Sequence, residues 1–135
     1  MKKLSEIDKI ELYPYGLWHK NTELHFDNTV LPISAKFSSS IDENMPLVKV
    51  IKLDDIAYDE RITFIKMDIE GAELNALKGS EQIIKHFRPK LAISVYHKPE
   101  DLWEIPAYIL SLRSDYKLYF RHYSFTNRET VLYAI

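Results

Sequence analysis

The chain has 135 residues, of which 46% are apolar and 28% charged, and its formal net charge is −2. This length can bury one hydrophobic core, so we expect a single domain over residues 1–135. No segment approaches the roughly 18 apolar residues of a membrane span, the start of the chain lacks the apolar stretch of a secretory signal, and cysteine is absent. Acidic and basic residues are interleaved, which leaves no basic patch for nucleic acid. We therefore expect a cytoplasmic protein without a membrane span and without a nucleic-acid partner.

Residues 1–46 have an irregular pattern. Segments 10–18 and 23–27 have the composition of short strands, the first interrupted by Pro14 and Gly16. The serine run and Pro46 predict a loop over residues 35–46. We expect no helix before residue 54. Apolar and basic residues alternate over residues 47–53, which predicts a strand with one wetter face.

The following segment has a much stronger pattern. Residues 62–69 and 91–96 are mostly apolar and rich in β-branched and aromatic side chains, which is typical of strands buried on both faces of a parallel sheet. Helical spacing lies between them, with a break at Gly79 and with Ser80 able to cap a second helical segment. Glu81 and Lys85 can pair on its outer face. This connection is long enough for a right-handed β-α-β crossover.

The last third of the chain predicts one helix and two strands. The helix follows residues 97–101, and we place Pro106 in the first turn of its main segment, where a missing N–H costs little. Residues 116–122 and 130–135 are strand-like, and only about seven residues join them, too few for a parallel crossover. They should form an antiparallel hairpin. Residues 47–135 thus predict the order β, α, β, α, β, β.

Titratable side chains follow the predicted strands where those strands end. Asp68 and Glu70 lie at the end of the 62–69 strand, and they would point the same way if the strand continued. His97 follows the 91–96 strand, and His122 ends the 116–122 strand. Because ligands bind beyond the carboxyl ends of the strands in open α/β sheets, we predict a site at this edge. Gly71 would allow the tight turn into the helix.

Each of these residues also has an ordinary structural explanation. Glu73 falls in the first helical turn, where the helix dipole favours a negative charge. Asp68 could form an ion pair with Lys66, two residues earlier on the same strand face. A histidine after a strand is more often a surface or hydrogen-bonded residue than a catalyst, and this applies to both His97 and His122.

A family resemblance rests on "ITFIKMDIEGAELNALKGSEQIIKHFRPKLAISVYHKPEDL", followed by "YKLYFRHYS" and "ETVLYAI". These segments, within residues 47–135, resemble the carboxyl-terminal half of the FkbM-type methyltransferases, which use S-adenosylmethionine. The resemblance implies an α/β, Rossmann-like class I methyltransferase fold, with parallel strands and a terminal antiparallel hairpin. It makes residues 62–69 the fourth strand, 91–96 the fifth and 10–18 the third.

The resemblance also defines what this chain lacks. Such enzymes bind the cofactor through a glycine-rich turn after the first strand and an acidic residue after the second. This chain has three glycines, Gly16, Gly71 and Gly79, and no glycine-rich turn. We therefore expect a truncated domain that lacks the first two strands. The 62–69 strand would then have an open edge, suited to a homo-oligomer or to a complementing chain.

Three functions remain open at this stage. By resemblance, the first is methyl transfer from S-adenosylmethionine to a hydroxyl of a sugar, lipid or small metabolite, with activity of the shortened chain undecided. In that reading Asp68 binds the cofactor beside its methyl group, Glu70 orients the acceptor and His97 is the candidate base. The second is a non-catalytic remnant that pairs through its strand edge. The third is a divalent-metal-dependent hydrolase or transferase using these residues and His122, but their spacing is not diagnostic, so we assign no metal site.

Overall fold

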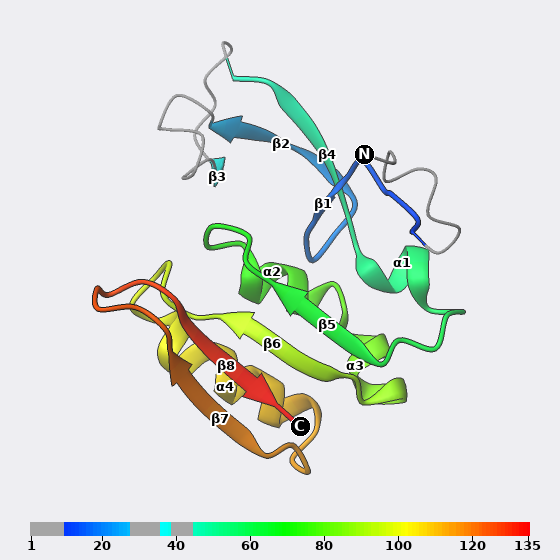
Figure 1. Ribbon diagram of the computed structural model, residues 1–135. Coiled ribbons are helices and arrows are strands. Elements are labelled where there is room, and N and C mark those ends of the chain that lie inside the picture. Colours follow the sequence, from blue (N-terminus) through cyan, green and yellow to red (C-terminus); the bar gives the residue numbers. More distant parts are fainter. Residues whose placement is uncertain (1–9, 28–35, 39–44) are drawn as a thin grey trace.

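The computed structural model describes residues 10–27, 36–38 and 45–135 (Figure 1). Its strands form two four-stranded mixed sheets, with strand orders β1-β4-β2-β3 and β5-β6-β8-β7. The elements in chain order are β1 (Gly16–Leu17), β2 (Thr22–Asp27), β3 (Lys36–Ser38), β4 (Leu47–Ile51), α1 (Leu53–Ala57), β5 (Phe64–Met67), α2 (Glu73–Lys78), α3 (Glu81–Phe87), β6 (Lys90–Ser94), α4 (Asp101–Leu112), β7 (Leu118–His122) and β8 (Thr130–Ala134). None of the described helices is long and apolar enough to span a bilayer.

The second sheet has the topology that the sequence predicts for residues 62–135. Strands β5 and β6 are parallel, with Ile65 opposite Leu91, and helices α2 and α3 connect them. Strands β7 and β8 are antiparallel and β8 also pairs with β6, so the predicted hairpin is confirmed. The predicted break between the two helical segments is present at Gly79 and Ser80.

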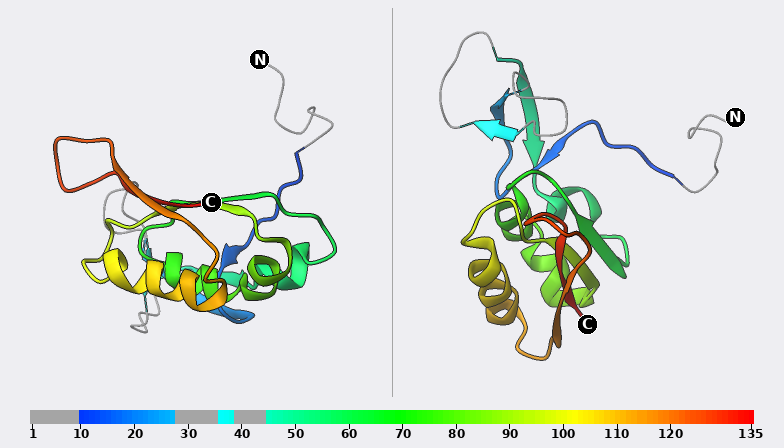
Figure 2. Two further views of the ribbon diagram at one scale, coloured as in Figure 1. Left: turned by 90° about the horizontal axis from the view of Figure 1, so that it is seen from below. Right: turned by 60° about the vertical axis from the view of Figure 1, so that its left-hand side comes forward.

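Helices lie on one side of this second sheet (Figure 2, left). The inner face of the sheet forms the core, in which Ile93 and Leu132 are completely buried. In β5, Ile65 is buried and Phe64 is 55% exposed, so the prediction that this strand is buried on both faces is wrong. The reason is that no helix of the described chain covers the outer face. Strand β6, between two neighbours, is buried from Leu91 to Ser94 as predicted.

The first sheet departs most from the prediction. Only Gly16–Leu17 of the predicted 10–18 strand is a strand, and it pairs with β4 in parallel, in a sheet separate from β5 and β6. Residues 36–38, which we expected in a loop, form β3 against β2. Residues 35 and 39–44 of that expected loop lie outside the described residues. Strand β4 ends at Ile51, and a short helix begins at Leu53, one residue earlier than we expected any helix.

Helix α3 is capped from a distant part of the chain. Carboxylate oxygens of Asp54 accept hydrogen bonds from the backbone N–H groups of Gln82 and Ile83, each at 3.0 Å. The prediction that the Ser80 side chain caps this helix is wrong, because its hydroxyl instead donates to the carbonyl of Ala76 at 2.7 Å. The predicted ion pair between Glu81 and Lys85 is present.

Proline 106 lies farther into α4 than predicted. The helix begins at Asp101, so Pro106 is its sixth residue and not part of a first turn. The helix starts early because the carboxylate of Asp101, 2% exposed, accepts the backbone N–H of Lys98 at 3.2 Å. The first turn of α4 therefore comes before Pro106. Because proline has no backbone N–H, one intrahelical hydrogen bond is missing at this position.

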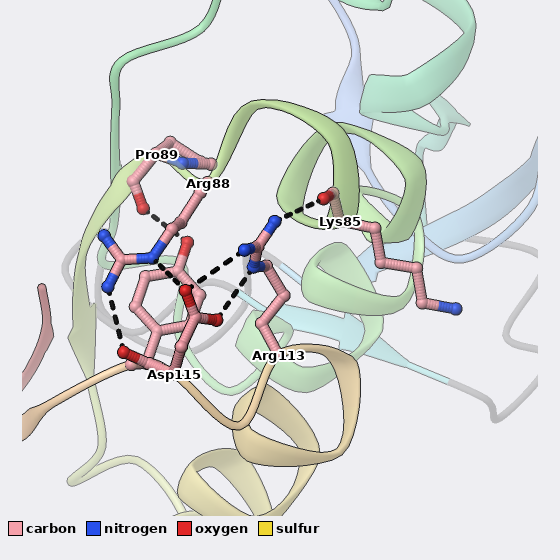
Figure 3. A network of polar contacts seen from close by, with 6 residues as sticks. Lys85, Arg88, Pro89, Arg113 and Asp115 are labelled. Atoms are coloured by element: carbon pink, nitrogen blue, oxygen red, sulfur yellow. Dashed lines mark hydrogen bonds and ion pairs between the residues drawn. The ribbon is translucent and has the colours of Figure 1, made fainter.

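An exposed network joins the end of α3 to the end of α4 (Figure 3). Asp115 accepts from Arg88 Nε at 2.8 Å and from Arg113 Nε at 2.9 Å, and Arg113 also donates to the carbonyl of Lys85. The hydrogen bond from Arg113, followed by that from Arg88, lowers the pKa of Asp115 to about 2. The network holds the left-handed backbone of Arg88, with φ 50°, where α3 turns into β6.

We expect Asp115→Asn to lower the urea midpoint of unfolding at pH 7, because the neutral amide loses both ion pairs. The folded-state pKa is depressed, so the stabilisation is complete above the ordinary pKa of an aspartate and disappears as the pH falls to about 2. The difference between the variant and the wild type should therefore close at that pH. Glu104→Gln, an exposed position in α4, is the control. An equal difference at both pH values would contradict a charge-dependent effect.

Candidate functional site

The candidate site lies beyond the carboxyl ends of the parallel strands β5 and β6. Strand β5 ends at Met67, so Asp68 and Glu70 do not share a strand face as they would if the strand continued. Instead the chain turns through Glu70 and Gly71, whose φ angles are 55° and 91°. This left-handed turn directs the chain into α2. Glycine adopts a positive φ without strain, whereas the Cβ of Glu70 makes the same conformation unfavourable.

His97 is the centre of the site. Its side chain is 8% exposed, and its Nε2 lies 3.5 Å from both Asp68 Oδ1 and Glu70 Oε2. Its Nδ1 lies 2.9 Å from Glu73 Oε1. The structure thus brings together the three residues that the sequence indicated for catalysis, Asp68, Glu70 and His97. It adds Glu73 to them.

Glu73 is completely buried, which its place in the first turn of α2 does not explain. Its Oε1 accepts the backbone N–H of Ile69 at 2.8 Å and also faces His97. The carboxylate therefore closes the turn that carries Glu70 and fixes the imidazole at the same time. Its Oε2 and the Nε2 atom of His97 are buried without a hydrogen-bond partner among the described residues.

The electrostatics of the site are dominated by converging carboxylates. Burial on its own would lower the pKa of His97, but hydrogen bonding to Glu73 and the charges of Glu73, Glu70 and Asp68 raise it above its ordinary value. Tyr96 donates its hydroxyl to Asp68 Oδ1 at 3.1 Å. Burial, and then Asp68, raises the pKa of Tyr96 to about 12, so this hydroxyl stays a donor at neutral pH.

Two sequence-based alternatives do not hold. Asp68 does not pair with Lys66, since its partners within the described chain are Tyr96 and His97, and Lys66 is on the exposed face of β5. His122 does not join the cluster either. Its Nδ1 lies 2.8 Å from the hydroxyl of Thr130 on the neighbouring strand, at an exposed position.

Lys98 is a site residue that sequence reasoning missed. Its ammonium group donates to the carbonyl of Gly71 at 2.5 Å, which ties the loop after β6 to the loop after β5. The only available signal was its position next to His97, since charged residues in a polar loop have no distinctive pattern.

A cavity of about 320 Å³ adjoins His97. Its walls include Tyr96, His97 and Lys98 from the loop after β6, and Asn127 and Thr130 from the segment that leads into and begins β8. The cavity is therefore lined by residues with amide and hydroxyl side chains, and among the clustered residues only His97 lines it. A small polar molecule could be held there by hydrogen bonds.

The fold and the sequence together identify the family to which this chain belongs. Residues 5–123 match the methyltransferase FkbM domain family, and the chain belongs to that family. It is similar to the crystal structure of methyltransferase FkbM from Methylobacillus flagellatus KT, determined at 2.20 Å resolution, with a TM-score of 0.76 and 34% sequence identity. The match covers 97% of this chain and 30% of that chain. A comparison with curated proteins found no match.

Proposed function

We propose that this chain takes part in methyl transfer from S-adenosylmethionine to a hydroxyl group of a sugar, lipid or small metabolite. Membership of the FkbM family supports methyl transfer in general. The observation that carries the finer proposal is the convergence of Asp68, Glu70 and His97 beyond the ends of β5 and β6. In our proposal this second sheet corresponds to the later strands of a Rossmann-like methyltransferase sheet.

The residues present fit the charged part of the cofactor. Its sulfonium and ammonium groups are cations, and three carboxylates converge here around one imidazole. Asp68 is 42% exposed, and its Oδ2 has no partner among the described residues, so it is the residue that would hold a cationic ligand. Gly16, Gly71 and Gly79 are too widely separated to form the glycine-rich turn that receives the adenosine end in related folds.

We assign the acceptor to the 320 Å³ cavity next to His97. The bound cofactor supplies an electrophilic methyl group, so an acceptor oxygen forms the new bond to carbon while the carbon–sulfur electron pair stays on sulfur. The acceptor proton must then move to a base. Glu70 is 36% exposed and lies 3.5 Å from His97, which lines the cavity, whereas His97 is nearly buried and has a raised pKa. The contacts therefore favour Glu70 as base and His97 as the residue that positions the carboxylates.

Binding of the cofactor tests this proposal. We expect S-adenosylmethionine to bind the purified chain in the micromolar range by calorimetry, and Asp68→Asn to weaken that binding at least about tenfold, since a charge-assisted contact of about 1.5 to 3 kcal/mol is lost. Glu70→Gln should leave cofactor binding nearly unchanged but lower transfer of radiolabelled methyl to sugar, lipid or metabolite acceptors by about 100-fold or more.

His122→Gln is the control for both measurements, because His122 contacts Thr130 and not the cluster. Absence of cofactor binding to the well-folded wild-type chain would contradict our proposal and favour a non-catalytic role. A loss of binding in Glu70→Gln equal to that in Asp68→Asn would contradict the separate roles.

One observation favours pairing through a strand edge as a second candidate function. Strand β5 pairs only with β6 among the described strands, so its other edge has free backbone groups beside the exposed Phe64. We propose that a second copy or a complementing chain pairs there. Sedimentation velocity at increasing concentration tests self-pairing. A chain that remains monomeric at about 100 μM would argue against self-pairing, because the dissociation constant would then be higher than that of a typical specific dimer.

A further inference from the structure

The cluster around His97 contains an unusual concentration of unsatisfied polar atoms. Nε2 of His97 and Oε2 of Glu73 are both buried, and neither has a hydrogen-bond partner within the described chain. Leaving one buried polar group unpaired typically costs about 1 to 3 kcal/mol, and such a group calls for an explanation such as a bound ion. Since Nδ1 already faces Glu73 Oε1 at 2.9 Å, the other two atoms point to a ligand that satisfies them together.

The geometry of the ionisable groups is compatible with one bound cation. Asp68, Glu73 and His97 can each offer one ligand atom, and these three atoms lie within 4.8 Å of one another. A carboxylate–carboxylate–imidazole set suits first-row divalent ions such as Mn²⁺ and Zn²⁺. Ligand atoms around such an ion, at about 2.0 to 2.2 Å from it, would be about 3 to 4 Å apart, so only small rotations of these side chains are required.

The second coordination layer is also present. Glu73 is held by the backbone N–H of Ile69, and Asp68 by the hydroxyl of Tyr96. Glu70 Oε2, 3.5 Å from His97 Nε2, is available as a fourth ligand. Outer hydrogen bonds of this kind orient ligands and raise metal affinity. The ligands come from two separate loops and the first turn of α2, which is why their spacing in the sequence is not diagnostic.

We propose that Asp68, Glu73 and His97 bind one divalent transition-metal ion, for which Mn²⁺ and Zn²⁺ are the appropriate probes. The ion neutralises the converging carboxylates and satisfies the buried polar atoms. It uses the inner oxygen of Asp68, and the second oxygen stays available to another ligand. The proposal concerns binding and does not depend on the proposed methyl transfer, because it is tested without cofactor or acceptor.

The test is a titration of the tag-free chain with MnCl₂, with free Mn²⁺ measured by electron paramagnetic resonance, and a parallel calorimetric titration with ZnCl₂. We expect one saturable site per chain. His97→Gln and Asp68→Asn should each weaken binding by about 10- to 100-fold or more, the effect that loss of even an outer-layer partner can have. Asp68 is 42% exposed, so Asp68→Asn tests the site without removing a buried side chain.

The matched control is His122→Gln, which replaces a histidine at another strand end and should leave the affinity unchanged. Circular dichroism and thermal melting establish that each variant is folded. The proposal is overturned if the wild-type chain shows no saturable site up to millimolar metal, or if His97→Gln and Asp68→Asn bind as tightly as His122→Gln. A negative result of this kind leaves cofactor binding, and so the proposed function, intact.

Discussion

Replacement of Glu73 by alanine is expected to lower the free energy of unfolding by about 3 kcal/mol, measured by urea denaturation at pH 7. The carboxylate is completely buried, and its loss leaves the N–H of Ile69 without its acceptor and His97 without its nearest charged partner. The same change should loosen the turn that carries Glu70. Amide hydrogen exchange at residues 68–73 would report that loosening directly.

Two variants separate this anchoring role from a simple helix-dipole effect. Glu104 also lies in the first turn of a helix but is exposed, so Glu104→Ala should cost less than about 1 kcal/mol. Glu73→Gln keeps an acceptor for Ile69 but removes the charge, and we expect an intermediate loss of about 1 to 2 kcal/mol. If Glu73→Ala lowers the free energy of unfolding no more than Glu104→Ala does, the helix dipole alone explains the contribution of Glu73 to stability.

Replacement of Gly79 by alanine is expected to destabilise the protein by about 2 to 3 kcal/mol. An added Cβ would lie 2.0 Å from the carbonyl oxygen of Trp18 and 3.3 Å from the Cα of Lys52, and both are backbone atoms that cannot rotate away. Trp18 is itself held by a hydrogen bond from its N–H to the carbonyl of Ile51 at 2.9 Å. The clash would therefore force the first sheet away from α2 and α3.

The contact with Trp18 and the backbone preference at this position predict opposite effects of Gly79→Ala on stability. Gly79 has φ −78°, an ordinary helical value, so alanine is not strained there. Without the clash, alanine would make the protein more stable by about 0.4 to 1 kcal/mol, because it restricts the unfolded chain. Lys78→Ala, an exposed neighbour in α2, should have little effect and serves as the control. A gain in stability in Gly79→Ala would contradict the close contact between Trp18 and the α2–α3 junction.

The pattern of apolar residues and the lengths of the loops predicted the second sheet well. The runs around Ile65 and Ile93, the helical spacing between them and the short link between β7 and β8 are all properties of neighbouring residues. Such properties are visible in a sequence because side-chain period and loop length restrict the elements locally. The same rules failed for β3 and for most of residues 10–18, where short strands depend on pairing with β2 or β4.

The candidate site was predictable in its location but not in its contacts. The carboxyl-end rule indicated Asp68, Glu70 and His97, and these three residues do meet. It could not indicate that Glu73 is the buried anchor, because a glutamate in a first helical turn is equally well explained by the helix dipole.

The sequence by itself determined the order of elements from β5 to β8 and the edge at which the polar residues gather. Only the tertiary structure decided that the strands form two sheets, that Asp54 caps α3 and that His97 lies among three carboxylates. The physical reason is that propensity and periodicity act between residues close in the chain. Strand partners, distant caps and buried charge contacts join residues far apart in the chain, so their energies are settled only when the whole fold forms.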